Sequence, residues 1–178
     1  MNNKRFSPAR QVALVGICAA ITECGKLVLA PLPNIEVVTL LTALFSYVFG
    51  ITGLISTFIF VISETLIWGF GTWVPSYFIY WPLLSALFVF FGRVGLRKRW
   101  ILTASALLMT ALFGVISSLV EVGLFSGRFD NFFYRFGIYY VRGIPFYAAM
   151  FITNLVLFPT LFLYFTSKLK TIKGRFIG

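Results

Sequence analysis

The chain contains no histidine among its 178 residues. This absence excludes the Ser-His-Asp arrangement, histidine-ligated metals, the HExxH zinc helix and general acid–base catalysis by an imidazole. No Walker A sequence is present, so we do not expect the chain to hydrolyse ATP by itself. We therefore predict that it is not an enzyme, with no catalytic residue, no metal site and no resident cofactor.

Charged residues are also scarce, at 11% of the chain, whereas a soluble domain carries about a quarter. Only five residues are acidic, and they show no paired-carboxylate motif. Sixty per cent of the chain is hydrophobic, with a mean hydropathy of +0.95. One small core cannot bury this many apolar side chains. Most of them must therefore face a lipid bilayer. A soluble globular protein, a disordered protein and a nucleic-acid-binding protein are excluded.

The chain has only two cysteines, Cys18 and Cys24. In a helix they would be about 9 Å apart along the axis, which is more than a disulfide accepts. We predict that both are reduced. The apolar run that contains them, 11–30, follows a basic start and lacks an A-x-A cleavage site, so we interpret it as a retained transmembrane helix rather than a signal peptide.

Six apolar segments are candidate membrane spans, if about 20 residues cross a bilayer and fewer suffice inside a protein. They are 8–30, 37–49, 52–68, 76–91, 100–125 and 138–166. No repeat or attached soluble domain is visible. The sequence predicts an all-α, polytopic six-transmembrane-helix bundle that forms a single domain over residues 1–178. The second and third segments could also form one bent hydrophobic unit.

The placement of positive charge tests the number of spans. Of the 15 lysines and arginines, three lie near the N-terminus, four between the fourth and fifth spans, and four after the sixth. Six spans put all of these on one side and leave four on the other. Because cytoplasmic loops are enriched in Lys and Arg, we predict cytoplasmic N- and C-termini and a multi-pass protein of the bacterial plasma membrane.

Small residues recur along the first span, at Ala9, Ala13, Gly16 and Ala20. Such a stripe lets another helix approach closely in lipid. It indicates either a docking face for a partner membrane protein or ordinary packing within the bundle, and the spacing alone does not choose between these.

Two loops on the predicted outer side carry candidate ligand contacts. After the first span, two prolines stop the helix, and Asn34 and Thr39 follow near the outer surface. Between the third and fourth spans, glycines 69 and 71 are surrounded by large aromatic residues, namely Trp68, Trp73, Tyr77, Tyr80 and Trp81. These aromatics are typical either of anchors at the lipid headgroups or of the wall of a cavity for a flat organic ligand.

Several charges fall inside or next to the spans. Arg128, Arg135 and Arg142 recur every seven residues, which would align them on one helix face. Glu23 and Lys26 are three residues apart, and we expect them to pair locally. For Arg142 and Glu64, a structural ion pair and a substrate contact remain equally open. A membrane enzyme would need an acid–base pair, and none is evident in this sequence.

The chain resembles the substrate-binding membrane subunit, or S-component, of energy-coupling factor (ECF) transporters for vitamins. The resemblance covers nearly the whole length and is carried by Ala19–Ala20, the segment PNIEVVT at 33–39, Phe49–Gly50, and GFGTW at 69–73 followed by Trp81. It is strongest to the cobalamin-type S-components, whose first motif reads PN-x-x-PVT. This sequence has Val37 where that motif has proline.

The resemblance implies a protein that binds a vitamin, with cobalamin expected, at its outer face. It also implies docking through Ala9, Ala13, Gly16 and Ala20 onto a transmembrane coupling subunit, which two cytoplasmic ATPase subunits drive. The residues expected to bind the ligand are Asn34, Thr39, Trp73, Tyr77 and Trp81, with Arg128, Arg135, Tyr139 and Arg142 in a lid. The alternatives are a different vitamin, such as pantothenate, folate, riboflavin or a pyrimidine precursor, and a self-sufficient secondary carrier.

Overall fold

The protein is all-helical, as the sequence predicted. The computed structural model describes residues 7–32, 35–126 and 130–177, and within these ranges it contains no strand. The helices are α1 (Pro8–Leu29), α2 (Val38–Phe49), α3 (Ile51–Trp68), α4 (Trp73–Arg93), α5 (Arg99–Val120), the π-helical turn η1 (Glu121–Phe125), α6 (Phe132–Leu157), the π-helical turn η2 (Phe158–Phe162) and α7 (Leu163–Ile177).

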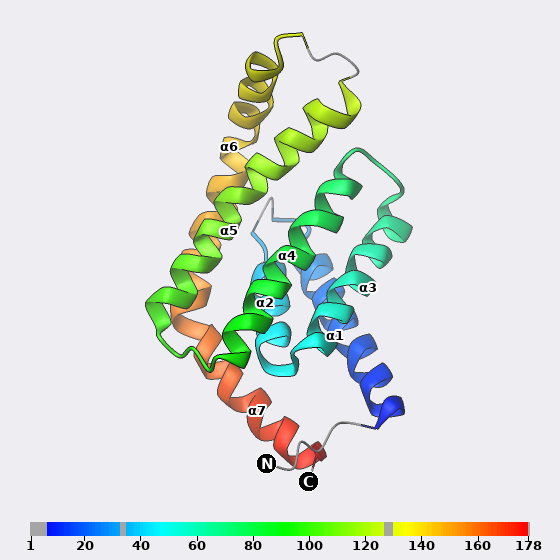
Figure 1. Ribbon diagram of the computed structural model, residues 1–178, viewed down its shortest axis with the longest axis vertical. Helices are drawn as coiled ribbons and strands as arrows, with labels where there is room; N and C mark the ends of the chain where they lie inside the picture. Colours follow the sequence, from blue (N-terminus) through cyan, green and yellow to red (C-terminus); the bar gives the residue numbers. More distant parts are fainter. Residues whose placement is uncertain (1–6, 33–34, 127–129, 178) are drawn as a thin grey trace.

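Helices α1 to α6 alternate in direction and α7 continues α6 beyond η2, so the start of α1 and the end of α7 lie at the same end of the molecule (Figure 1). The α5–α6 hairpin consists of α5, η1 and α6, which pack against each other along their length. At the end opposite the termini this hairpin extends beyond α3 and α4 (Figure 1). The bundle therefore has one end that carries both termini and one end that carries the α1–α2, α3–α4 and α5–α6 connections.

Within the described part of the chain, five helical stretches are long and apolar enough to cross a membrane: Pro8–Leu29, Ile51–Trp68, Trp73–Arg93, Arg99–Phe125 and Phe132–Arg175. The predicted second span is a helix of only 12 residues, which measures about 18 Å against a hydrocarbon layer of about 30 Å. Ten of these 12 residues are buried. Because α2 is surrounded by other helices, its length need not match the bilayer.

The connection between α2 and α3 is Gly50 alone, which has φ +64°. Glycine adopts this left-handed conformation without steric penalty, and the chain reverses there. The second and third apolar segments are therefore two helices packed side by side (Figure 1), and not one bent unit.

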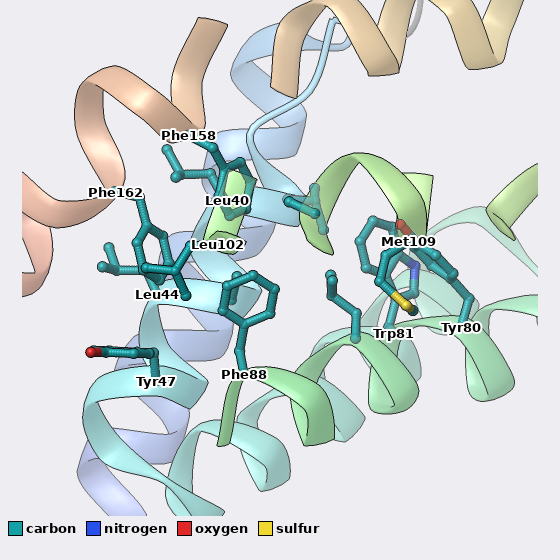
Figure 2. Packing of buried hydrophobic residues seen from close by; sticks show 14 of the residues in the cluster. Leu40, Leu44, Tyr47, Tyr80, Trp81, Phe88, Leu102, Met109, Phe158 and Phe162 are labelled. Carbon is teal, nitrogen blue, oxygen red and sulfur yellow. The ribbon is translucent and has the colours of Figure 1, made fainter. Parts of the chain in front are cut away.

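Aromatic side chains from η2 fill the centre of the bundle near α2 (Figure 2). The rings of Phe158 and Phe162 stack with centroids 5.3 Å apart and an interplanar angle of 12°. Phe88 of α4 contacts both rings, at 5.8 and 5.4 Å. All three side chains are almost completely buried, so η2 joins the last helical stretch to α2 and α4.

Two glycines allow helices to approach α2 closely. A Cβ atom at Gly92 of α4 would lie 2.2 Å from the carbonyl oxygen of Tyr47, and one at Gly53 of α3 would lie 2.5 Å from backbone atoms of Phe45. Because the obstructing atoms are backbone atoms, they cannot move aside without separating the helices.

We predict that Gly92→Ala destabilises the protein by about 1–3 kcal/mol, because the added methyl group forces α4 away from α2. Thermal unfolding of the purified protein in detergent measures the effect. Gly137→Ala is the control, because a Cβ there meets no atom within 4 Å. Equal unfolding temperatures for the two variants would contradict the close packing of α4 on α2.

Candidate functional site

A cavity of about 250 Å³, which we call the main cavity, lies at the end of the bundle opposite the termini. Apolar residues of the α1–α2 connection form one side of it. The remaining lining includes Glu36, which precedes α2. It also includes Lys26 of α1, Tyr77 and Trp81 of α4, Phe113 of α5 and Met150 of α6. A side cavity of about 220 Å³ shares Lys26 and Tyr77 with it and is bounded also by Glu64, Trp68 and Trp73.

The aromatic wall of both cavities comes from one face of α4. Trp73, Tyr77 and Trp81 are four residues apart, which places them on the same side of a helix. The Trp73 and Tyr77 rings are 4.8 Å apart, and the Tyr77 and Trp81 rings are 5.8 Å apart. Because α4 begins at Trp73, three residues before the predicted start, Trp73 is helical and belongs to this face.

The other aromatics of this region are placed differently. Trp68 is 56% exposed at the end of α3, which suits an anchor at a membrane interface as well as a cavity wall. Tyr80 is completely buried and packs on Trp81 and Phe113, with ring centroids 4.7 and 4.8 Å away. The predicted aromatic cluster therefore contains three kinds of residue. Trp73, Tyr77 and Trp81 form the cavity wall, Trp68 lies at the exposed end of α3, and Tyr80 belongs to the core.

Glu36 was not among the predicted ligand contacts, yet it lines the main cavity and organises the start of α2. Its carboxylate accepts hydrogen bonds from the backbone N–H of Thr39 at 2.8 Å and from the Thr39 hydroxyl at 2.6 Å. The Asn154 side-chain amide of α6 donates a third, at 3.0 Å. These bonds satisfy a free backbone donor at the helix start.

Thr39 itself is completely buried, and its hydroxyl is bonded to Glu36. It therefore supports the cavity through Glu36 and is not on the cavity surface. The order Glu36-x-x-Thr39 is the reverse of a capping box, so the sequence carried no recognised signal of this bond. Asn34 lies outside the described residues.

The expected local pair between Glu23 and Lys26 is wrong. The Lys26 ammonium instead donates to Glu64 Oε2 on α3, 38 residues away, and forms a salt bridge with it. Glu23 accepts a hydrogen bond from the Ser63 hydroxyl at 2.9 Å. Glu64 is 1% exposed and Glu23 is 8% exposed, so the more deeply buried carboxylate takes the cation and the other takes a neutral donor.

One carboxylate oxygen of each glutamate, Glu23 Oε1 and Glu64 Oε1, receives no donor from the described residues. We call Glu23, Lys26, Ser63 and Glu64 the buried polar network.

The predicted lid residues lie apart from both cavities. Arg135, Tyr139 and Arg142 are on the part of α6 that belongs to the projecting hairpin, and none of them lines the main or the side cavity. Arg142 instead borders a shallow depression with Tyr134. Arg128 lies outside the described residues.

The small-residue stripe of α1 faces outward. Ala9, Ala13, Gly16 and Ala20 are all exposed, and a Cβ added at Gly16 would meet nothing within 4 Å. The opposite face of α1 packs into the bundle. Packing within the chain therefore does not explain the stripe. Ala13 also borders an apolar groove of about 380 Å³ formed with residues of α2 and α7.

The described residues contain neither a metal centre nor a disulfide. No group of three or more of their His, Cys, Asp or Glu side chains could hold a metal ion. Both cysteines are free, as the sequence predicted, with Cys18 buried and Cys24 exposed. What the geometry offers is a cavity with an aromatic wall and an outward-facing stripe of small residues on α1.

Comparisons of the chain with protein families, curated proteins and solved structures found no match.

Proposed function

We propose that this chain is the S-component of an ECF-type vitamin transporter, located in the bacterial plasma membrane. It would capture a vitamin at the outer face and deliver it inward by docking on a coupling subunit that two ATPase subunits drive. The observation that carries the proposal is the main cavity, which has aromatic walls and lies at the end of the bundle opposite both termini. In the proposed topology, six helical segments cross or enter the bilayer and both termini are cytoplasmic.

The placement of charge supports this topology. Arg93, Arg97, Lys98 and Arg99 lie at the end of α4 and the start of α5, and α7 carries four further basic residues. Because α1 to α6 alternate in direction and α7 continues in the direction of α6, these clusters lie at the same end of the bundle as the start of α1 (Figure 1). The positive-inside rule then assigns that end to the cytoplasm and the cavity to the outside.

The size of the cavity bears on which vitamin is bound. A volume of about 250 Å³ is below the range of about 300–1,000 Å³ that is usual for small-molecule sites. A corrinoid with its side chains and nucleotide loop is several times larger. In this conformation the site suits a ligand of pantothenate or pyrimidine-precursor size better than cobalamin, which would need the α1–α2 connection to move away from α4.

A self-sufficient secondary carrier is the second candidate, and one observation favours it. The buried polar network contains two carboxyl groups and an ammonium beside the cavity, which is the kind of site that couples proton movement to transport. The exposed stripe on α1 favours the S-component instead, because a carrier that works alone has no need of a docking face.

Replacing the cavity wall tests the proposed binding site. We predict that Trp73→Ala weakens ligand binding by more than about tenfold, because truncation of a buried aromatic anchor often costs 2 kcal/mol or more. The measurement is a titration of the purified chain with whichever of cobalamin, pantothenate, folate, riboflavin or a pyrimidine precursor raises its unfolding temperature. Trp100→Ala, at a 73% exposed position far from the cavity, is the control. Unchanged affinity in the Trp73 variant would remove this residue from the site.

Bulky substitutions on α1 test the proposed docking face. Ala13→Trp and Ala20→Trp should prevent co-purification of the coupling subunit, since a large side chain keeps a second helix at a distance. Ligand binding should be unchanged, because neither residue lines the main or the side cavity. Val28→Trp is a matched control on an exposed part of α1 outside the stripe. Recovery of the coupling subunit in undiminished amount with both stripe variants would refute the assignment.

A further inference from the structure

Negative charge gathers around the cavities although the whole chain carries a net charge of +10. Glu36 lines the main cavity, Glu64 lines the side cavity, and Glu23 accepts a hydrogen bond from Ser63, the residue next to Glu64. These are three of the five acidic residues of the chain.

Lys26 is the only basic residue among the described residues that line either cavity. It pairs with the Glu64 carboxylate, whereas Glu36 and Glu23 accept hydrogen bonds from uncharged donors only. Acidic groups therefore outnumber basic groups at the site. An anionic ligand would be repelled by this excess, and a cationic ligand would be attracted.

The aromatic wall also favours a cationic ligand over an anionic one. The faces of tyrosine and tryptophan rings attract cations when the positive charge lies within about 6 Å of the ring centroid. The Lys26 ammonium already occupies such a position, 5.3 Å from the centroid of Tyr77, while it is bonded to Glu64. The protein therefore shows with its own side chain where a positive charge is stabilised.

Two of the buried polar atoms that have no hydrogen-bond partner among the described residues belong to side chains that line the cavities. Trp81 is 3% exposed and lines the main cavity, and its indole N–H has no acceptor there. Glu64 is 1% exposed and lines the side cavity, and its Oε1 atom has no donor. Because buried polar groups are normally hydrogen-bonded, the first calls for an acceptor and the second for a donor.

Resting on the proposed function, we propose that the ligand is a flat organic cation, a protonated or quaternary nitrogen heterocycle that also carries a hydrogen-bond acceptor. Its positive charge takes the position that Lys26 holds against Tyr77 and Glu64, and its acceptor meets the Trp81 N–H. Lys26 is 28% exposed and ends a flexible stem, so it can turn toward solvent when the ligand enters. In the free protein, Lys26 is thus a tethered competitor of the ligand.

The first test compares two aromatic probes of similar size and opposite charge, benzyltrimethylammonium and 3-phenylpropionate. The purified full-length chain is titrated with each in detergent at pH 8, and tryptophan fluorescence reports binding because Trp73 and Trp81 line the cavities. The proposal predicts that the cation binds at least about tenfold more tightly than the anion. Equal affinities, or a preference for the anion, would overturn it.

The second test removes the internal competitor. Lys26→Met keeps the length of the side chain, so the proposal predicts that the cation binds at least about fivefold more tightly than to the unaltered chain. The double variant Lys26→Met/Glu64→Gln lacks the carboxylate as well, and it should bind the cation more weakly than Lys26→Met by about tenfold or more. Lys168→Met, an exposed lysine in α7, is the matched control and should change neither affinity.

If the ligand were an anion, Lys26→Met would weaken binding instead of strengthening it, because Lys26 would then be the group that holds the ligand. Loss of probe binding in Lys26→Met, with an unfolding temperature that still shows a folded protein, would overturn the proposal. If this variant does not fold, the comparison of the two probes on the unaltered chain decides the question.

The failure of this inference is distinguishable from that of the proposed function. A chain that prefers the cation but does not join a coupling subunit would retain the inferred ligand class and lose the assignment as an S-component. A chain that joins the coupling subunit but prefers the anion would do the reverse.

Discussion

The constraint on which this structure depends is a carboxylate, Glu64, that is 1% exposed inside an apolar helix bundle. An isolated charge there would cost far more free energy than a protein of this size has to spare. The structure meets the constraint with the Lys26 ammonium from α1, while the neighbouring Glu23 accepts a hydrogen bond from Ser63 of α3. These contacts fix α1 against α3 and confine the polar atoms to the end of the bundle where the cavities lie.

A second constraint comes from the short helix α2. Because ten of its 12 residues are buried, its first backbone donors cannot be satisfied by water. Glu36 bonds to Thr39 there, and Asn154 connects the same carboxylate to α6. Helices α3 and α4 also approach the backbone of α2 closely, at Gly53 and Gly92, so α2 is enclosed on those sides as well. One side of the main cavity is thus held by bonds from separate helices, which favours a site that is formed before the ligand arrives.

Much of the helical framework could be predicted from hydropathy, because long apolar runs have few other folds available. The boundaries were less predictable, and α4 begins at Trp73 rather than residue 76 because the aromatic segment that reads as a loop continues as helix. The wall of Trp73, Tyr77 and Trp81 follows from their spacing once that start is known. The pairing of Lys26 with Glu64 could not be found, because residues 38 apart meet only through the packing of α1 on α3. Likewise, Arg135 and Arg142 share a helix, but the length of the α5–α6 hairpin carries them away from the cavities.

The central claim is that the chain captures its ligand and takes the energy for transport from other proteins. The most direct measurement is uptake by lipid vesicles of a radiolabelled compound that binds the purified chain, with the chain reconstituted either alone or together with a coupling subunit and its ATPases. The account predicts accumulation only in vesicles that contain the full complex and ATP. Accumulation in vesicles that contain the chain alone would contradict it.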